Sequence, residues 1–154
     1  MMPARFGLFL LSLVLFSLVG AQAALTELED YEAALAQAAK EDKFVLLDFT
    51  GSDWCPPCKM MEKEVFSTEE FATFAEKNLV VVKLDFSPTG AKPGKFQDQH
   101  NYLAQRFQIQ VFPTFVLLNP KGSPIAYEKG YQPGGAASFI KWVEATRQKA
   151  ATGG

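Results

Sequence analysis

The sequence is poor in residues that cross-link a chain or bind metal ions. Its 154 residues contain two cysteines, Cys55 and Cys58, and one histidine, His100. A structural zinc site needs about four ligands, so these three residues argue against one. A disulfide between cysteines so close in the chain closes a very small loop and adds little as a structural staple. The remaining interpretation is a chemically reactive dithiol.

A strong excess of charge is also missing. The sequence has 15 Lys and Arg against 17 Asp and Glu, which gives a net charge of −2, and the two signs are interspersed. There is no basic patch and no long tail of like charge, so we expect no nucleic-acid partner. We find no internal repeat, and the length suits one domain with a hydrophobic core.

Long apolar runs are confined to the N-terminus. Arg5 precedes the apolar run Phe6–Val19, and Ala21-Gln22-Ala23 then offers small residues to a signal peptidase. We predict a signal peptide over residues 1–23, one domain over 24–150 and a flexible tail over 151–154. An uncleaved membrane anchor is the alternative, although the run is shorter than the roughly 20 residues of a membrane span. The signal predicts a periplasmic or secreted protein.

The two cysteines lie between a strand-like and a helix-like run. The apolar run Phe44–Phe49 precedes them, and the run Lys59–Val65 follows. The unpaired N–H groups and dipole of a helix N-terminus favour the thiolate form of cysteine. We expect Cys55 at the N-cap to be the more exposed sulfur and the nucleophile. Cys58, one turn into the helix, would resolve the mixed disulfide.

The rest of the chain alternates between helical and strand patterns. A capping box at Thr26–Glu29 predicts a helix to about Lys40, and Ser67–Glu70 predicts another to about Lys77. The pattern is α-β-α-β-α-β-β-α, which predicts an α/β fold with a central mixed sheet covered by helices on both faces. The further strands are expected at residues 79–85, 111–118 and 125–128, and the further helices at 96–107 and 136–149.

Two motifs resemble the thioredoxin family over roughly residues 27–149. The first is Trp54-Cys55-Pro56-Pro57-Cys58-Lys59 after a strand, and the second is Phe112-Pro113-Thr114 before a hairpin. The lead-in Thr50–Trp54 and the signal peptide resemble secreted bacterial members. The periplasmic thioredoxin-like domain of the reductase DsbD is similar. The resemblance implies a thioredoxin fold and thiol–disulfide exchange.

The resemblance also implies roles for four further residues. Asp48, a carboxylate within an apolar strand, would move a proton to or from the inner cysteine; a solvent-facing Asp48 is the alternative. Trp54 would be a flat contact surface, or else simply pack on the helix. Pro113 would be cis and beside the dithiol, and Phe112 would contact the bound peptide or be an ordinary core aromatic. We expect His100, in a polar stretch, at the surface.

These residues support several hypotheses about function. The leading one is an enzyme that reduces protein disulfides through Cys55 and Cys58, without a cofactor or metal, as a monomer. Its partners would be protein disulfides or dithiols and a membrane electron donor of the DsbD type. An oxidase or isomerase would use the same residues. Two further alternatives are a module that binds Cu(I) and a thioredoxin-fold interaction domain whose redox activity is incidental.

Overall fold

The computed structural model describes residues 23–88 and 95–152 of the chain. The predicted signal peptide therefore lies outside the described residues, apart from Ala23. The elements follow one another in this order: β1 (Glu27–Leu28), α1 (Tyr31–Glu41), β2 (Phe44–Thr50), α2 (Pro56–Met61), the π-helix η1 (Glu62–Phe66), α3 (Glu69–Asn78), β3 (Leu79–Asp85), α4 (Lys95–Arg106), β4 (Thr114–Leu118), β5 (Pro124–Lys129) and α5 (Gly135–Thr152).

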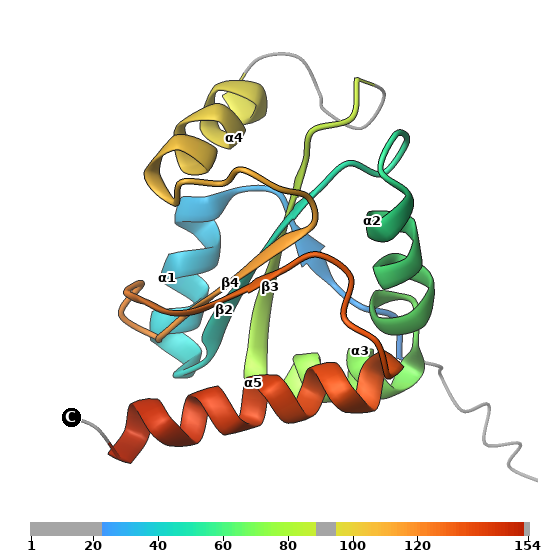
Figure 1. Cartoon of the computed structure of the whole chain (residues 1–154). Helices are drawn as coiled ribbons and strands as arrows, with labels where there is room; N and C mark the ends of the chain where they lie inside the picture. Colours follow the sequence, from blue (N-terminus) through green and yellow to red (C-terminus); the bar gives the residue numbers. More distant parts are fainter. Residues whose placement is uncertain (1–22, 89–94, 153–154) are drawn as a thin grey trace, which may run out of the picture.

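A five-stranded mixed sheet forms the centre of the molecule (Figure 1). Its order is β1-β3-β2-β4-β5; β1, β3 and β2 are parallel, whereas β4 is antiparallel to β2 and to β5. Helices α1 and α4 cover one face, and α2, η1, α3 and α5 cover the other. The predicted α/β architecture is confirmed.

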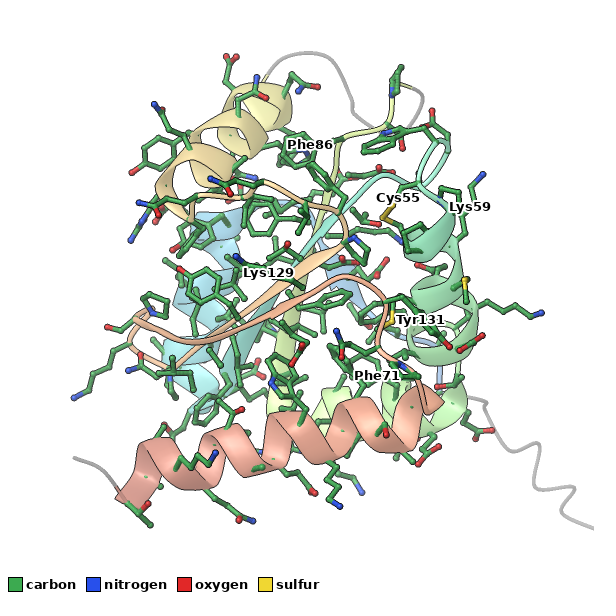
Figure 2. The ribbon with its side chains drawn as sticks, viewed as in Figure 1. Cys55, Lys59, Phe71, Phe86, Lys129 and Tyr131 are labelled. Carbon is green, nitrogen blue, oxygen red and sulfur yellow. A yellow bond between two sulfur atoms is a disulfide. The ribbon has the colours of Figure 1, made fainter. Side chains whose placement is uncertain are left out.

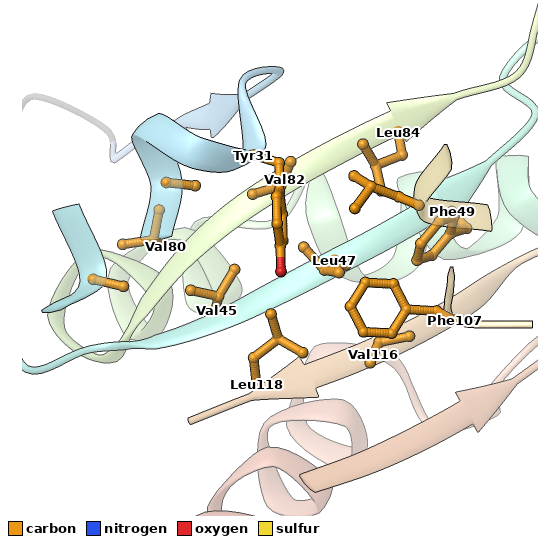
Figure 3. Packing of buried hydrophobic residues seen from close by; sticks show 13 residues of the cluster. Tyr31, Val45, Leu47, Phe49, Val80, Val82, Leu84, Phe107, Val116 and Leu118 are labelled. Atoms are coloured by element: carbon orange, nitrogen blue, oxygen red, sulfur yellow. The ribbon is translucent and has the colours of Figure 1, made fainter. Parts of the chain in front are cut away.

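Strand β2 is buried on both faces, as its continuous apolar run predicts. Because side chains alternate along a strand, Val45, Leu47 and Phe49 join the core beneath α1 and α4 (Figure 3). Leu46 joins the opposite core beneath α2, α3 and α5. Asp48 lies two residues after Leu46 and so points to the face that carries the cysteine helix.

The N-terminal helix begins later than its capping box predicts. Glu27 and Leu28 form β1 and pair with Val81 and Val82 at the edge of the sheet. The N-cap is Asp30, whose carboxylate accepts a hydrogen bond from the Ala33 N–H at 3.1 Å. The prediction of a helix from Thr26 was wrong because pairing with β3 satisfies this backbone in an extended form.

The ends of other elements differ more modestly from the predictions. Helix α3 is capped by Thr68 rather than Ser67, because the Thr68 hydroxyl accepts from the Phe71 N–H. Strand β4 begins at Thr114, since Pro113 has no N–H to give to a ladder. Helix α5 continues to Thr152, so part of the predicted tail is helical; residues 150–152 are helix-compatible and no glycine or proline interrupts them.

His100 is buried, with 3% of its surface exposed, so its predicted surface position was wrong. It lies four residues after Phe96 and three before Leu103, on the apolar stripe of α4. Its ring packs 5.7 Å from that of Phe86. Burial lowers the pKa of His100, although the Asp85 backbone acts in the opposite direction.

Candidate active site

The two cysteines lie at the start of α2 and form a disulfide (Figure 2). Cys55 is the N-cap, and its Sγ accepts a hydrogen bond from the Cys58 N–H at 3.3 Å. Pro56 occupies the first helical position, where the lack of an N–H costs nothing. Both cysteines are 3% exposed, which contradicts the prediction that Cys55 is the more exposed. In the disulfide the two cysteines are equally buried, so exposure does not single out Cys55.

The loop before Cys55 is fastened to the end of β3 by hydrogen bonds. The Ser52 N–H donates to Asp85 Oδ1 at 3.0 Å, and the Ser52 hydroxyl donates to Asp85 Oδ2. The Asp53 N–H donates to the hydroxyl of fully buried Ser87 at 2.9 Å. Burial would raise the pKa of Asp85, but the hydrogen bonds from Ser52 and Ser87 lower it below its usual value. These bonds set the position of the loop that carries Trp54 and Cys55.

Sequence reasoning did not identify Ser52, Asp85 or Ser87 as site residues. A usable signal was present, because β2 and β3 are neighbouring parallel strands and polar residues follow the end of each. The carboxyl ends of such strands meet at one edge of the sheet, where ligand sites of α/β folds are found.

Trp54 and Phe112 meet on the surface beside the disulfide. Trp54 is 51% exposed, and its ring centroid lies 5.4 Å from that of Phe112 in an edge-to-face contact. Phe112 in turn contacts Phe86 at 5.2 Å. The Phe112–Pro113 peptide bond is cis, as predicted. The structure thus brings Trp54, Phe112 and Pro113 together next to the cysteine loop.

Gly51 allows the Trp54 indole to lie against this loop. A Cβ at Gly51 would stand 2.4 Å from Cε2 of the indole, which is closer than real Cβ contacts. The indole Nε1 also donates to the Phe86 carbonyl at 3.4 Å. A small residue at position 51 is therefore part of how the exposed aromatic surface is held.

Asp48 is 2% exposed, so its prediction as a buried carboxyl is confirmed. Burial raises its pKa well above the usual value; Lys83 lowers it, while Glu27, Glu62 and Asp85 raise it further. Lys83 Nζ lies 2.9 Å from Glu62 Oε2 and 3.3 Å from Glu27 Oε2. Burial alone would lower the pKa of Lys83, but these carboxylates and Asp48 raise it above its usual value.

A cleft of about 320 Å³ reaches from the inner cysteine to two members of this charged group. Cys58 lines it together with Glu62 and Lys83. The inner cysteine therefore lies next to ionisable side chains. The full lining consists of Thr50, Ser52, Cys58, Lys59, Glu62, Lys63, Ser67 and Lys83.

Two other kinds of feature are absent from the residues that the structure describes. Across residues 23–88 and 95–152, no group of three or more His, Cys, Asp or Glu is placed to hold a metal ion. Within the same ranges, no helix has the length and apolar character needed to span a bilayer.

Comparison with known proteins agrees with the geometry. A family model described as "Thioredoxin-like domain" matches residues 31–147. The chain belongs to the thioredoxin-like family. A solved structure named "DsbH Oxidoreductase" superposes with a TM-score of 0.75 at 30% identity, covering 82% of this chain and 88% of the other. A thioredoxin from Thermus thermophilus gives 0.55 at 27% identity, over 85% and 91%. The thioredoxin fold is thereby confirmed.

The curated relatives include proteins with names of the Dsb type. "Disulfide bond reductase DsbH" of Chlamydia pneumoniae is 31% identical over 75% of this chain and 69% of its own length. "Thiol:disulfide interchange protein DsbD 2" of Pseudomonas aeruginosa is 27% identical over 78% of this chain. The match covers only 19% of DsbD 2. With the Cys55–Cys58 pair, these relatives identify this thioredoxin-like protein as a thiol–disulfide oxidoreductase of the Dsb type.

Proposed function

We propose that this protein reduces disulfides of other proteins in the periplasm or outside the cell. The chemistry rests on the Cys55–Cys58 disulfide at the start of α2. The observation that carries the direction is the similarity to the disulfide bond reductase DsbH, which is 31% identical over 75% of this chain. A dithiol whose thiolate is only weakly stabilised has a low, reducing potential.

The chemical step transfers two electrons from the dithiol to a substrate disulfide. The Cys55 thiolate attacks one substrate sulfur, which forms a mixed disulfide and releases the other sulfur to take up a proton. Cys58 then loses its proton and attacks Cys55 Sγ. The Cys55–Cys58 bond forms and the second substrate sulfur leaves and is protonated. The substrate disulfide is reduced and the enzyme dithiol is oxidised.

Four other residues have proposed roles in this step. Asp48 accepts the Cys58 proton, because burial raises the pKa of its carboxyl well above the usual value and so makes the carboxylate a better base. Trp54, Phe112 and Pro113 form the surface that the substrate chain contacts, and the exposed Trp54 ring supports this. A membrane carrier of the DsbD type would re-reduce the enzyme, which functions as a monomer.

The reduction potential tests the direction of electron flow. Equilibration with glutathione buffers should give a value below about −200 mV, nearer thioredoxin than DsbA. A value above about −150 mV would contradict the proposal and favour an oxidase or isomerase. In cells, loss of the DsbD-type carrier should leave Cys55–Cys58 oxidised.

Trapping variants test the roles of the two sulfurs. Cys58→Ser should accumulate mixed disulfides on non-reducing gels, because the second attack is blocked. Cys55→Ser is the matched control and should accumulate few. Equal trapping by both variants would overturn the assignment.

The predicted signal peptide is tested by the mass of the protein that a bacterial host exports. We expect a chain of residues 24–154.

A further inference from the structure

Asp48 and Lys83 are neighbours that do not form an ion pair. They are register partners on the parallel strands β2 and β3, so their side chains leave the same face of the sheet. A carboxylate and an ammonium in these positions would be expected to meet. Instead, among the described residues, Asp48 Oδ1 is buried without a hydrogen-bond partner, and the ion pairs of Lys83 are with Glu27 and Glu62.

The competing carboxylates come from two different elements. Glu27 lies on β1, which pairs with β3 two residues from Lys83. Glu62 follows α2, and its Oε2 lies 2.9 Å from Lys83 Nζ. Glu27 is the less exposed of the two, with 24% of its side chain accessible against 44% for Glu62. Because the backbone of Glu27 is paired in the sheet, its carboxylate is a partner of Lys83 that is held in place.

We propose that Glu27 is a positioning residue of the active site: it holds the Lys83 ammonium away from Asp48, so that the Asp48 carboxyl is not tied into an ion pair and can take up the proton that Cys58 releases. The inference rests on the proposed proton transfer by Asp48. Glu27 itself touches neither the substrate nor a reacting sulfur. It acts through Lys83, whose positive charge lowers the pKa of Asp48, whereas the carboxyl groups of Glu27, Glu62 and Asp85 raise it.

The arrangement is costly for folding, which supports a role in chemistry. Glu27 Oε1 is buried and lacks a hydrogen-bond partner within the described residues. Burial raises the pKa of Glu27 despite the neighbouring Lys83. A second unsatisfied carboxyl oxygen beside Asp48 destabilises the fold, so packing alone does not account for a glutamate on β1.

The direct test is the pKa of Asp48, measured by carboxyl ¹³C NMR in the whole protein without any substrate. Asp48→Asn assigns the signal. In Glu27→Gln, Lys83 is released toward Asp48, and the pKa of Asp48 should fall by about one unit or more. Glu144→Gln, which removes an exposed charge from α5, is the matched control and should leave it unchanged. An unchanged Asp48 pKa in Glu27→Gln would overturn the inference.

A second pair of variants separates position from charge. Glu27→Asp keeps the negative charge but shortens the reach to Lys83, so it should also lower the Asp48 pKa. If it behaves as the wild type, Glu27 acts only through its charge and the positioning role is wrong. In a Lys83→Met background no ammonium is left to release, so Glu27→Gln should then have a smaller effect; an undiminished effect would likewise contradict the role.

The pH profile of disulfide exchange gives the functional readout. The part of the pH–rate curve that reports the ionisation of Asp48 should move to lower pH in Glu27→Gln. The size of this move should equal the measured shift in the Asp48 pKa. A shifted pKa with an unshifted profile would disprove the link to proton exchange. Failure of the proposed reductase direction would instead appear in the reduction potential, which is measured separately.

Discussion

The carboxyl group of Asp48 has opposite consequences for stability and for chemistry. In the folded protein burial raises its pKa, whereas the unfolded chain gives it an ordinary value near 3.9. Folding therefore favours the protonated form. Its stabilising contribution is fully present below the unfolded pKa and is lost as the pH rises through the folded pKa. The same raised pKa makes the carboxylate a stronger base and therefore a better proton acceptor.

Replacing Asp48 by asparagine should separate these two consequences. Asp48→Asn should have a higher urea midpoint than the wild type at pH 8, because no buried charge forms. At pH 4 the two midpoints should be close, since protonated Asp48 resembles asparagine in size and charge. Insulin reduction should be slower in the variant at neutral pH. If neither the midpoint nor the rate changes, Asp48 plays no part in the mechanism.

Single residues also show what the sequence could and could not reveal. The pairing of Cys55 with Cys58 and the burial of Asp48 followed from their neighbours in the chain. The burial of His100 did not, because its polar neighbours obscured the helical spacing to Leu103. The contact of Lys83 with Glu27 depends on strand order, since the two residues lie on different strands and are far apart in the chain. No local pattern encodes such a contact.

Among the elements, the loop between β2 and α2 depends most on other parts of the chain. Its N–H groups at Ser52 and Asp53 donate to Asp85, the last residue of β3, and to Ser87, which follows the strand. The loop carries both Trp54 and Cys55, so its anchoring sets the position of the nucleophile. A change at Ser87, which touches neither sulfur in the described contacts, therefore affects the site indirectly.

Ser87→Ala should weaken this anchoring. The loss of hydrogen bonds at a buried position should lower the free energy of unfolding by about 1 to 3 kcal/mol. The Asp53 amide should exchange its hydrogen faster in deuterated buffer. Ser123→Ala, at an exposed turn position, is the control and should change neither quantity. Unaltered exchange at Asp53 in Ser87→Ala would show that the loop holds itself in place.

The start of α1 offers a test of two competing caps. The structure makes Asp30 the N-cap, whereas the capping-box pattern favours Thr26. Asp30→Ala should therefore lower the free energy of unfolding by about 1 kcal/mol, and Thr26→Ala should change it little, because Thr26 is exposed. Urea denaturation of both variants decides between them. A larger loss of stability in Thr26→Ala than in Asp30→Ala would show that the helix begins at Thr26.

At the scale of the whole molecule, most of the architecture could be predicted. Strands β2 and β3 are largely apolar and the helices have clear apolar stripes. From these patterns, a sheet covered by helices on both faces could be predicted. Strand β1 could not be predicted, because two residues show no alternation and acquire their form by pairing with β3. The π-helix η1 could not be predicted either, since the sequence of residues 62–66 also suits an ordinary α-helix.

Redox state and stability are linked across the whole protein. A thermodynamic cycle links two differences. The difference in unfolding free energy between the oxidised and reduced forms is proportional to the difference in reduction potential between the folded and unfolded protein. Each ~1.4 kcal/mol corresponds to about 30 mV. If the folded protein is reducing relative to its unfolded chain, the oxidised form should have the higher urea midpoint. A more stable reduced form would contradict the proposed direction of electron flow.

Helix α5 crosses the end of the molecule remote from the disulfide (Figures 1 and 2). A peptide tag attached at the C-terminal end of α5 would thus emerge on the side away from Cys55. Protein immobilised through such a tag would face its reactive end toward the solution. This orientation makes the molecule suitable as a surface-bound bait, on which the Cys58→Ser variant retains its natural clients for release by a reducing agent and identification.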